Sequence, residues 1–167
     1  MRLTRGSDYG AHAVIELASQ YGQGPVQCAE IAARQKIPVA YLDQLLSSLR
    51  RAGIVRSSRG PHGGHELARD PRQITLGDIV TALEGPVAPR EFVHATDGSD
   101  DATDWLSACA VRNVWHAAAV ASQRVLDGTT IQELVEQQSR IRAHREQRAG
   151  SGMAQQPETL VNTSTLS

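Results

Sequence analysis

The fold is decided by residues 42–67, which read LDQLLSSLRRAGIVRSSRGPHGGHEL. Four leucines recur at i, i+3, i+4 and i+7, a spacing that places them on one buried helix face. Two arginines and a glycine then mark the helix end, because cations and a left-handed glycine both suit a helix C-terminus. A strand over 54–59, a glycine-rich turn over 60–64 and a return strand over 65–67 predict a hairpin. The leucines are Leu42, Leu45, Leu46 and Leu49, and the closing glycine is Gly53.

The segments before this stretch predict two further helices. One spans about 7–21, with Ala11, Val14, Ile15 and Ala18 on its buried stripe, and a short one spans about 29–35. Residues 36–38 form the turn into the leucine-bearing helix, where Pro38 lacks an N–H that a helix entry would leave unpaired. This order predicts a winged helix-turn-helix, mainly α with a small β-hairpin wing, and makes DNA the leading partner.

Four segments are expected along the chain. Residues 1–84 form the winged helix-turn-helix domain, in which Thr75 and Asp78 have capping-box spacing for a helix through Ala82. Residues 85–103 form an acidic loop. Residues 104–148 hold a long helix over about 104–126 and a C-terminal helix, which Thr129 and Gln132 start with a second capping box. Residues 149–167 offer nothing to bury and are expected to be disordered.

The long helix predicts a homodimer. It is rich in alanine and carries Leu106, Val114, Ala117 and Ala121 on one surface. A helix of roughly 20 residues spans about 30 Å, more than so small a domain needs for its own core. The surplus apolar face is most simply buried against a second copy.

The charge of the chain changes sign along its length. The formal net charge is -1, yet residues 50–72 hold six arginines against two carboxylates, whereas residues 85–135 hold three basic residues against seven acidic ones. A local basic patch suffices for nucleic-acid binding, because phosphate contacts depend on the field at the interface. The alternative is an ordinary solvated face.

Composition also narrows the class of protein. Two cysteines make no disulfide framework, no apolar run approaches a membrane span, and the first residues lack the apolar core of a signal peptide. A cytoplasmic protein with no membrane partner is therefore expected. An enzyme would need Cys109, His116 and Asp104 to converge, but their spacing scatters them around one helix, so no enzyme is expected.

The chain resembles the IscR/NsrR/CymR (Rrf) family of bacterial winged-helix transcriptional regulators, over about residues 1–138. The matching stretches are MRLT (1–4), YLDQLL (41–46), LRRAGIV (49–55), RGPHGG (59–64), ITLGDI (74–79), LEGP (83–86) and TTIQEL (129–134). The resemblance implies a homodimer with crossed long helices. It also implies a palindromic operator, with half-sites about 10 bp or a multiple of that apart. Because the family mostly represses, a repressor is expected.

The resemblance also implies which residues contact DNA: Tyr41, Asp43, Gln44, Arg50, Arg51, Arg56, Arg59, Gly60, His62 and Gly63. Gln44 and Asp43 stand where such proteins read base edges, as Gln can bond adenine and Asp can accept from cytosine. Arg59 would enter the minor groove. The other arginines and His62 are interpreted as phosphate contacts. Arg50 and Arg51 have an alternative role, in which their charge complements the dipole at the helix C-terminus. The alternative for His65 is a packing role.

The family's sensory site is only partly present. Many relatives hold an iron–sulfur cluster with three cysteines, but here only Cys109 matches that set, so no cofactor is expected. Asp8 and His12, one helical turn apart, could join Cys109 and His94 in a mixed-ligand cluster across the dimer. The alternative is an Asp8 that caps the helix or forms a salt bridge, with a structural His12. A bare redox thiol at Cys109, a regulatory protein or metabolite as the signal, and a winged module that binds protein also stay open. Cys28 is expected to be a small buried hydrophobe.

Overall fold

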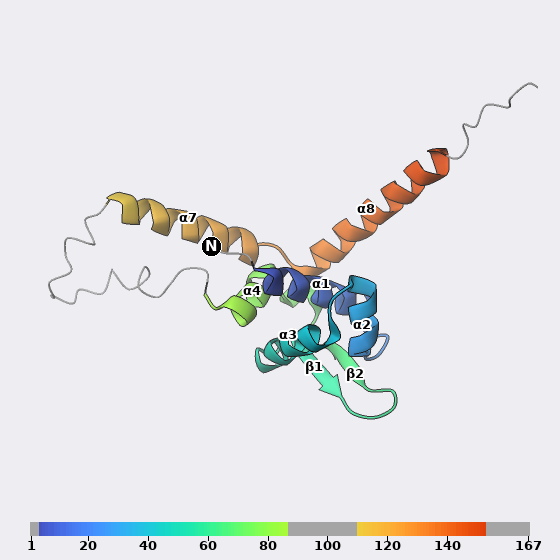
Figure 1. The fold of residues 1–167 in the computed structure, drawn as a ribbon. Coiled ribbons are helices and arrows are strands. Elements are labelled where there is room, and N and C mark those ends of the chain that lie inside the picture. The colour runs from blue at the N-terminus through green and yellow to red at the C-terminus, as the bar shows by residue number, and fades with distance from the viewer. Residues whose placement is uncertain (1–3, 87–109, 153–167) are drawn as a thin grey trace, which may run out of the picture. The chain divides into compact units, whose positions relative to one another are not determined.

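The computed structural model describes residues 4–86 and 110–152. This part of the chain is mainly helical with one two-stranded hairpin (Figure 1). Its elements are α1 (Arg5–Ser19), α2 (Cys28–Gln35), α3 (Val39–Arg51), β1 (Val55–Ser58), β2 (Gly64–Leu67), the short 3-10 helix η1 (Pro71–Gln73), α4 (Leu76–Glu84), α7 (Ala110–Asp127) and α8 (Ile131–Gly152). The winged helix-turn-helix with a long C-terminal helix is thereby confirmed.

The chain divides into two compact units, Met1–Val135 and Glu136–Ser167. Most of the acidic loop expected over 85–103 lies outside the described residues, as do the first residues of the long helix expected from 104. Of the expected tail over 149–167, residues 149–152 continue α8 and the remainder lies outside the described residues. Within the described residues, no helix combines the length and apolar character needed to span a bilayer.

Helix α1 begins two residues earlier than expected because Thr4 caps it. The Thr4 hydroxyl accepts a hydrogen bond from the Gly6 N–H at 3.0 Å, and the Thr4 N–H donates to Ser7 Oγ at 3.1 Å. This reciprocal capping box satisfies backbone donors that the first turn would otherwise leave unpaired. The Thr4 hydroxyl also donates to Glu84, which joins the start of α1 to the end of α4.

The buried face of α1 differs from the expected stripe. Val14 and Ala18 are buried as expected, whereas Ala11 and Ile15 are only half-buried, and Ile15 packs against the edge of the core. The other core positions are Ala13 and Leu17. Helix α4 packs closely over Gly10, where a Cβ would overlap the Leu83 side chain.

Helices α2 and α3 form the helix-turn-helix. Lys36 adopts a left-handed conformation (φ 56°) at the end of α2, Ile37 is buried, and Pro38 caps α3. The stripe of Leu42, Leu45, Leu46 and Leu49 is confirmed as buried. Gly53 follows α3 with φ 71°, the left-handed conformation expected for a closing glycine.

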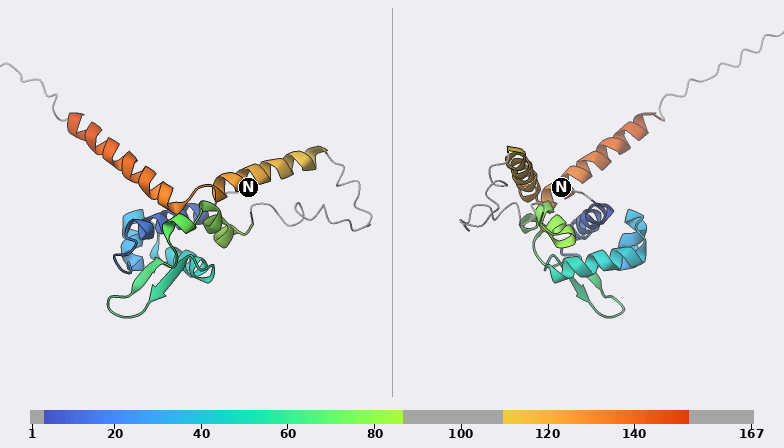
Figure 2. Two further views of the ribbon diagram at one scale, coloured as in Figure 1. Left: turned by 180° about the vertical axis from the view of Figure 1, so that it is seen from behind. Right: turned by 60° about the vertical axis from the view of Figure 1, so that its left-hand side comes forward.

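The wing is the antiparallel pair β1 and β2, with Val55 opposite Leu67 and Ser58 opposite Gly64. Gly64 was expected in the turn but begins β2, because Val26 extends the sheet. Val26 and His65 exchange two backbone hydrogen bonds of 2.8 Å in an isolated bridge, and a Cβ on Gly64 would overlap the Val26 carbonyl. The hairpin projects beyond the neighbouring helices in both views of Figure 2.

The capping box of α4 is confirmed, whereas that of α8 is one residue later than expected. Thr75 and Asp78 exchange two hydrogen bonds of 3.1 Å. At α8 the equivalent pair is Thr130 and Glu133, so the assignment to Thr129 and Gln132 is wrong. An antiparallel bridge between Thr75 and Thr130 fixes this register, and the Thr129 hydroxyl instead donates to the Val125 carbonyl at 2.8 Å.

Candidate nucleic-acid interface

The exposed face of α3 lies opposite its leucine stripe. Asp43 and Gln44 are both exposed, in contrast to the buried Leu42 and Leu45 on either side. Recognition helices contact base edges mainly with their N-terminal residues, and these two side chains lie in the first half of α3. The structure therefore presents both predicted base-reading side chains to solvent.

Two apolar residues share this end of α3 and were missed by the sequence analysis. Val39, with 52% of its surface accessible, and Ala40 are exposed at the first two helical positions. An exposed valine at a helix start contributes nothing to the core, and apolar side chains can pack against the thymine methyl group. Their positions in the sequence, one helical turn before Asp43 and Gln44, could have identified them as part of the same exposed face.

Tyr41 faces a different way. Its ring stands edge-on to that of Tyr9 from α1, with the ring centroids 6.0 Å apart and the planes at 74°. A Cβ on Gly6 would lie 3.0 Å from the Tyr41 hydroxyl oxygen. Tyr41 thus packs between α3 and the start of α1, apart from Asp43 and Gln44.

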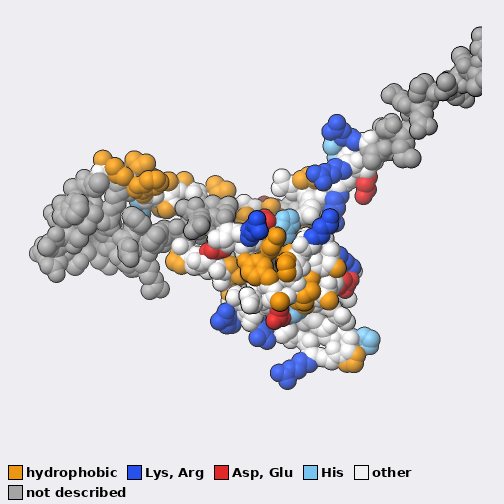
Figure 3. All heavy atoms as spheres, in the orientation of Figure 1, with side chains coloured by type: hydrophobic (Ala, Val, Ile, Leu, Met, Phe, Trp, Pro, Cys, Tyr) orange, Lys and Arg blue, Asp and Glu red, His pale blue; other side chains and the backbone are white. Residues whose placement is uncertain are grey.

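Glycines shape the turn of the wing. Gly60 has φ 115°, a conformation that other residues rarely adopt. A Cβ on Gly63 would overlap the Ser58 carbonyl, so the turn folds tightly back on β1. Arg59 and His62 are exposed beside these glycines. Basic side chains protrude from the end of the domain that carries α3 and the wing (Figure 3).

The three other predicted arginines already have protein partners. Arg56 forms an ion pair of 3.1 Å with Glu66, its opposite residue on β2. Arg50 donates to Ser57 Oγ at 3.4 Å, and Arg51 donates to Ser48 Oγ at 3.0 Å. Since all three remain exposed, these contacts orient guanidinium groups at the interface without burying them.

His65 lies on β2 of the wing and is half-buried. Its Nδ1 atom is buried and has no hydrogen-bond partner among the described residues. Burial lowers the pKa of His65, and the positive charge of Arg50 adds to this, while Asp43 acts in the opposite direction. Burial and Asp43 both raise the pKa of the Cys28 thiol. Cys28 is therefore a protonated, half-buried thiol, and His65 favours its neutral form.

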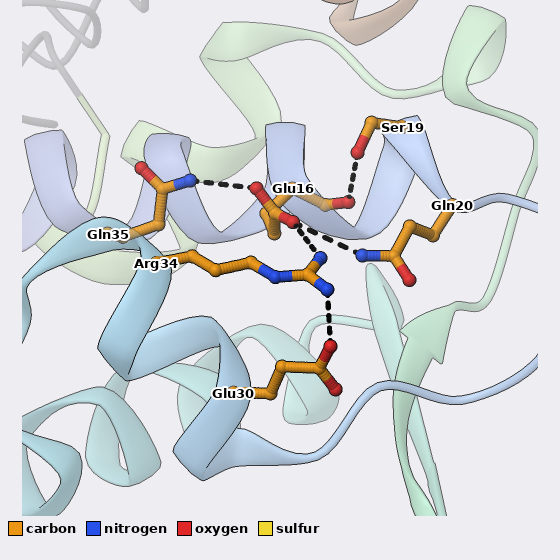
Figure 4. Close-up of polar contacts among 6 residues, drawn as sticks. All are labelled: Glu16, Ser19, Gln20, Glu30, Arg34 and Gln35. Carbon is orange, nitrogen blue, oxygen red and sulfur yellow. Dashed lines mark hydrogen bonds and ion pairs between the residues drawn. The ribbon is translucent and has the colours of Figure 1, made fainter.

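A buried carboxylate fixes α2 against α1. Figure 4 shows Arg34, Gln35 and Gln20 converging on Glu16, which is 7% exposed. Arg34 Nη1 donates to Glu16 at 2.6 Å, Gln35 at 2.8 Å and Gln20 at 3.2 Å, and Arg34 also pairs with Glu30. Burial alone would raise the pKa of Glu16, but the hydrogen bonds from Arg34, Gln35 and Gln20 outweigh it and lower the pKa.

The predicted cluster ligands are only partly described. Asp8 and His12 face each other on α1, with Oδ1 and Nε2 3.7 Å apart. Cys109 and His94 lie outside the described residues. Across residues 4–86 and 110–152, no three metal-binding side chains gather at one place.

The chain is similar to known regulators over most of its length. The model of the Rrf2 family, described as "Iron-dependent Transcriptional regulator", matches residues 3–137. HTH-type transcriptional regulator CymR of Bacillus subtilis is 37% identical over 134 residues, 80% of this chain and 89% of the relative. IscR of Sodalis glossinidius is 38% identical over 137 residues, 81% of this chain and 79% of the relative.

Solved structures give the same result. CymR, the global cysteine regulator of B. subtilis, matches with a TM-score of 0.66 at 36% identity, covering 81% of this chain and 97% of that chain. IscR of T. potens matches with a TM-score of 0.65 at 34% identity, covering 82% of this chain and 88% of that chain. With the helix-turn-helix, the wing and most of the sequence in common, the chain belongs to the Rrf2 family of HTH-type transcriptional regulators and is not an enzyme.

Proposed function

We propose that this regulator is a cytoplasmic homodimeric repressor of a palindromic operator. In each half-site, α3 enters the major groove with Gln44 and Asp43 toward base edges, and the wing delivers Arg59 to the minor groove. Arg50, Arg51 and Arg56 position the protein on the phosphates. The observation that carries the proposal is the division of α3 into a buried leucine stripe and an exposed face that presents Asp43 and Gln44.

The wing supports a DNA partner more strongly than a protein partner. Its turn is thin, because Gly60, Gly63 and Gly64 stand where side chains would be strained or would overlap backbone atoms. A narrow turn flanked by an arginine suits a DNA groove, whose negative potential rises as the groove narrows. An affinity for DNA that does not fall as salt is raised would favour the protein-binding alternative.

The apolar face of α7 supports the dimer. Val111, Val114, Trp115 and Val125 are each at least 60% exposed in the single chain. Their spacing of three, four and fourteen residues places them on one side of the helix. Large exposed apolar surfaces mark interaction sites in proteins of this size, and a second α7 is an occupant of matching chemistry.

The proposal assigns no iron–sulfur cluster to the signal. The usual site needs three thiolates, and the chain has two cysteines, of which Cys28 lies on α2 with a raised pKa. We therefore propose that a regulatory protein or a metabolite carries the signal. The proximity of Asp8 and His12 favours one second candidate, a mixed-ligand cluster completed by Cys109.

Anaerobic purification separates these two candidates. We expect a colourless, iron-free dimer by absorption spectroscopy and iron assay. The contrary result is bound iron with visible absorption, both lost in Asp8→Ala and both kept in the control Asp70→Ala, which changes a distant loop. That result would establish the mixed-ligand cluster and overturn the cofactor-free proposal.

Selection from a pool of random DNA duplexes tests the function itself. The full-length chain is expected to enrich a palindrome, and footprinting should show two protected half-sites separated by about 10 bp or a multiple of that. Enrichment of a motif without two-fold symmetry would refute the homodimeric arrangement. Failure to enrich any motif would refute sequence-specific DNA binding.

A further inference from the structure

The distal part of α8 carries features that the family fold does not explain. The family model ends at residue 137, whereas α8 continues to Gly152. Residues from Glu136 onward form a unit of their own, and every residue from Ser139 to Arg148 is exposed. A helix of this length is marginal in water when nothing packs against it. A partner would therefore stabilise it.

One face of this helix is basic. Gln137, Arg140, Ile141, His144, Arg145 and Arg148 border one shallow, open depression. Their spacing of three and four residues places them on a single side of α8. Figure 3 shows basic side chains along this helix. We call this set the α8 basic face.

The charges of the α8 basic face are not balanced locally. Residues 136–148 contain four arginines and two glutamates, and neither Glu136 nor Glu146 belongs to the face. Glu146 projects from the opposite side, since it lies five residues after Ile141. Among the described residues, no carboxylate forms an ion pair with Arg140, Arg145 or Arg148. The three guanidinium groups are available to an anionic partner.

The spacing of these arginines fits a phosphate backbone. Arg140 and Arg148 are separated by about 12 Å along the helix axis, at about 1.5 Å per residue. A DNA strand presents one phosphate for about every 3.4 Å of its axis, so this distance spans three to four phosphates. Arginine binds phosphate oxygens in a bidentate manner. Ile141, between Arg140 and Arg145, and Gln137, before Arg140, add no charge.

We propose that the α8 basic face is a second DNA-binding surface, which contacts the phosphates of duplex DNA beside the operator. The proposal rests on the proposed function, because a chain that holds DNA through α3 and the wing carries α8 on the same molecule and so raises the effective concentration of duplex for it. The contact adds affinity and salt dependence without reading bases.

The test compares the full-length chain with the triple variant Arg140→Gln, Arg145→Gln and Arg148→Gln. Glutamine keeps a high helix propensity, so α8 is preserved. Binding is measured against salt on three duplexes: the selected operator alone, the operator with about one helical turn of DNA on each side, and a mixed-sequence duplex. We expect the triple variant to lose about tenfold or more in affinity for the flanked operator, with a salt slope reduced by about 2–3 for each protomer whose α8 contacts DNA. The loss should be smaller on the operator alone.

Two single variants provide the matched control. Arg140→Gln and Arg142→Gln remove the same charge from positions about 200° apart around the helix. Only Arg140→Gln should lower the salt slope, by about 0.9 for each protomer whose α8 contacts DNA. Equal slopes for the two would overturn the proposal. An unchanged affinity and salt slope in the triple variant would also overturn the proposal. So would a loss of affinity that is explained by dissociation of the dimer, which sedimentation would detect. If no operator is selected, the proposed function fails, but the mixed-sequence duplex still decides the role of α8.

Discussion

Arg56 and Arg59 lie three residues apart on the wing but differ in what their guanidinium groups contact. Arg56 is held by Glu66 at 3.1 Å, so part of its charge is already compensated. Arg59 is exposed beside Gly60, and no ion pair holds it among the described residues. Protein contacts thus divide the arginines of the wing into one that is prepositioned and one that is free to enter a groove.

We expect Arg59→Ala to weaken operator binding more than Arg56→Ala does. Removal of a groove-inserted arginine should cost about 1–3 kcal/mol and relax sequence preference at the contacted position. Arg56→Ala also frees Glu66, and its effect should be a uniform loss across sequences with a salt slope lower by about 1. Titration of both variants at physiological salt measures the difference. Unchanged binding by Arg59→Ala would contradict its placement in the groove.

His65 predicts a pH dependence of stability. Its pKa lies below the ordinary 6.5 of an unfolded chain because burial disfavours the cation. As pH falls below 6.5, the unfolded chain binds a proton that the folded chain does not, so the free energy of unfolding decreases. Above 6.5 the full stability is present. The decrease ends once pH passes below the folded pKa.

Urea unfolding of the wild type and of His65→Phe at a series of pH values checks this prediction. The phenylalanine variant removes the titrating group and should show a flatter stability profile just below pH 6.5. Parallel profiles for the two proteins would assign the pH dependence to other groups.

At the scale of elements, the position of α2 depends on one carboxylate of α1. Glu16 accepts hydrogen bonds from Arg34 and Gln35 of α2, and Gln20 of α1 completes its contacts. These bonds join the first helix of the helix-turn-helix to the domain core, and α3 packs on both α1 and α2. The orientation of the recognition helix therefore depends on a network remote from any base contact.

We expect Glu16→Ala to lower the free energy of unfolding by about 2–3 kcal/mol, because three donors lose a buried charged acceptor. Ser19→Ala is the matched control, since the Ser19 hydroxyl donates only to the Glu16 backbone carbonyl at 2.7 Å and is exposed. Its cost should stay near 0.5 kcal/mol or less. Denaturant unfolding measures both. Equal losses would show that the Glu16 carboxylate has no special structural role.

Elements with strong local signals were predicted correctly from sequence. The leucine stripe of α3, the left-handed Gly53 and the capping box of Thr75 and Asp78 each depend on residues within one or two helical turns. The errors concern features set by distant contacts. The extent to which Ile15 is buried depends on the helices that pack on α1, and the α8 box shifts to Thr130 because that residue pairs with Thr75.

The same distinction applies to the candidate site. Exposure of Gln44 and Asp43 follows from the leucine periodicity, so their side of α3 was predictable. The pairing of Arg56 with Glu66 required the strand register, and the contact between Tyr41 and Tyr9 required the packing of α1 on α3. Neither can be read from local spacing.

At the scale of the whole molecule, the proposed two-fold symmetry depends on α7. Trp115 is 63% exposed on the apolar face that we propose to be buried in the dimer. A charge placed there would lose its hydration on association, which costs several kcal/mol unless it is paired. One residue on α7 should thus control the oligomeric state and, through the oligomeric state, the affinity of the distant helix-turn-helix for DNA.

We expect Trp115→Glu to be monomeric by sedimentation velocity and to bind a single half-site far more weakly than the wild type binds the whole operator. Asn113→Glu is the control, because it adds the same charge to an exposed position on the opposite side of α7. It should remain dimeric. A dimeric Trp115→Glu would place the interface on another surface.

The bridge between Val26 and His65 ties the wing to the connection between α1 and α2. The wing is therefore not an interchangeable part, although it is nearly continuous in sequence. A designer who transplants residues 59–66 from a relative would also have to transplant the residue that pairs with His65, and the transplanted segment would need glycine at position 64 to admit the carbonyl of that residue. Homologous recombination with a crossover between residues 27 and 64 separates these partners, so natural and engineered chimeras should fold best when both segments come from one parent.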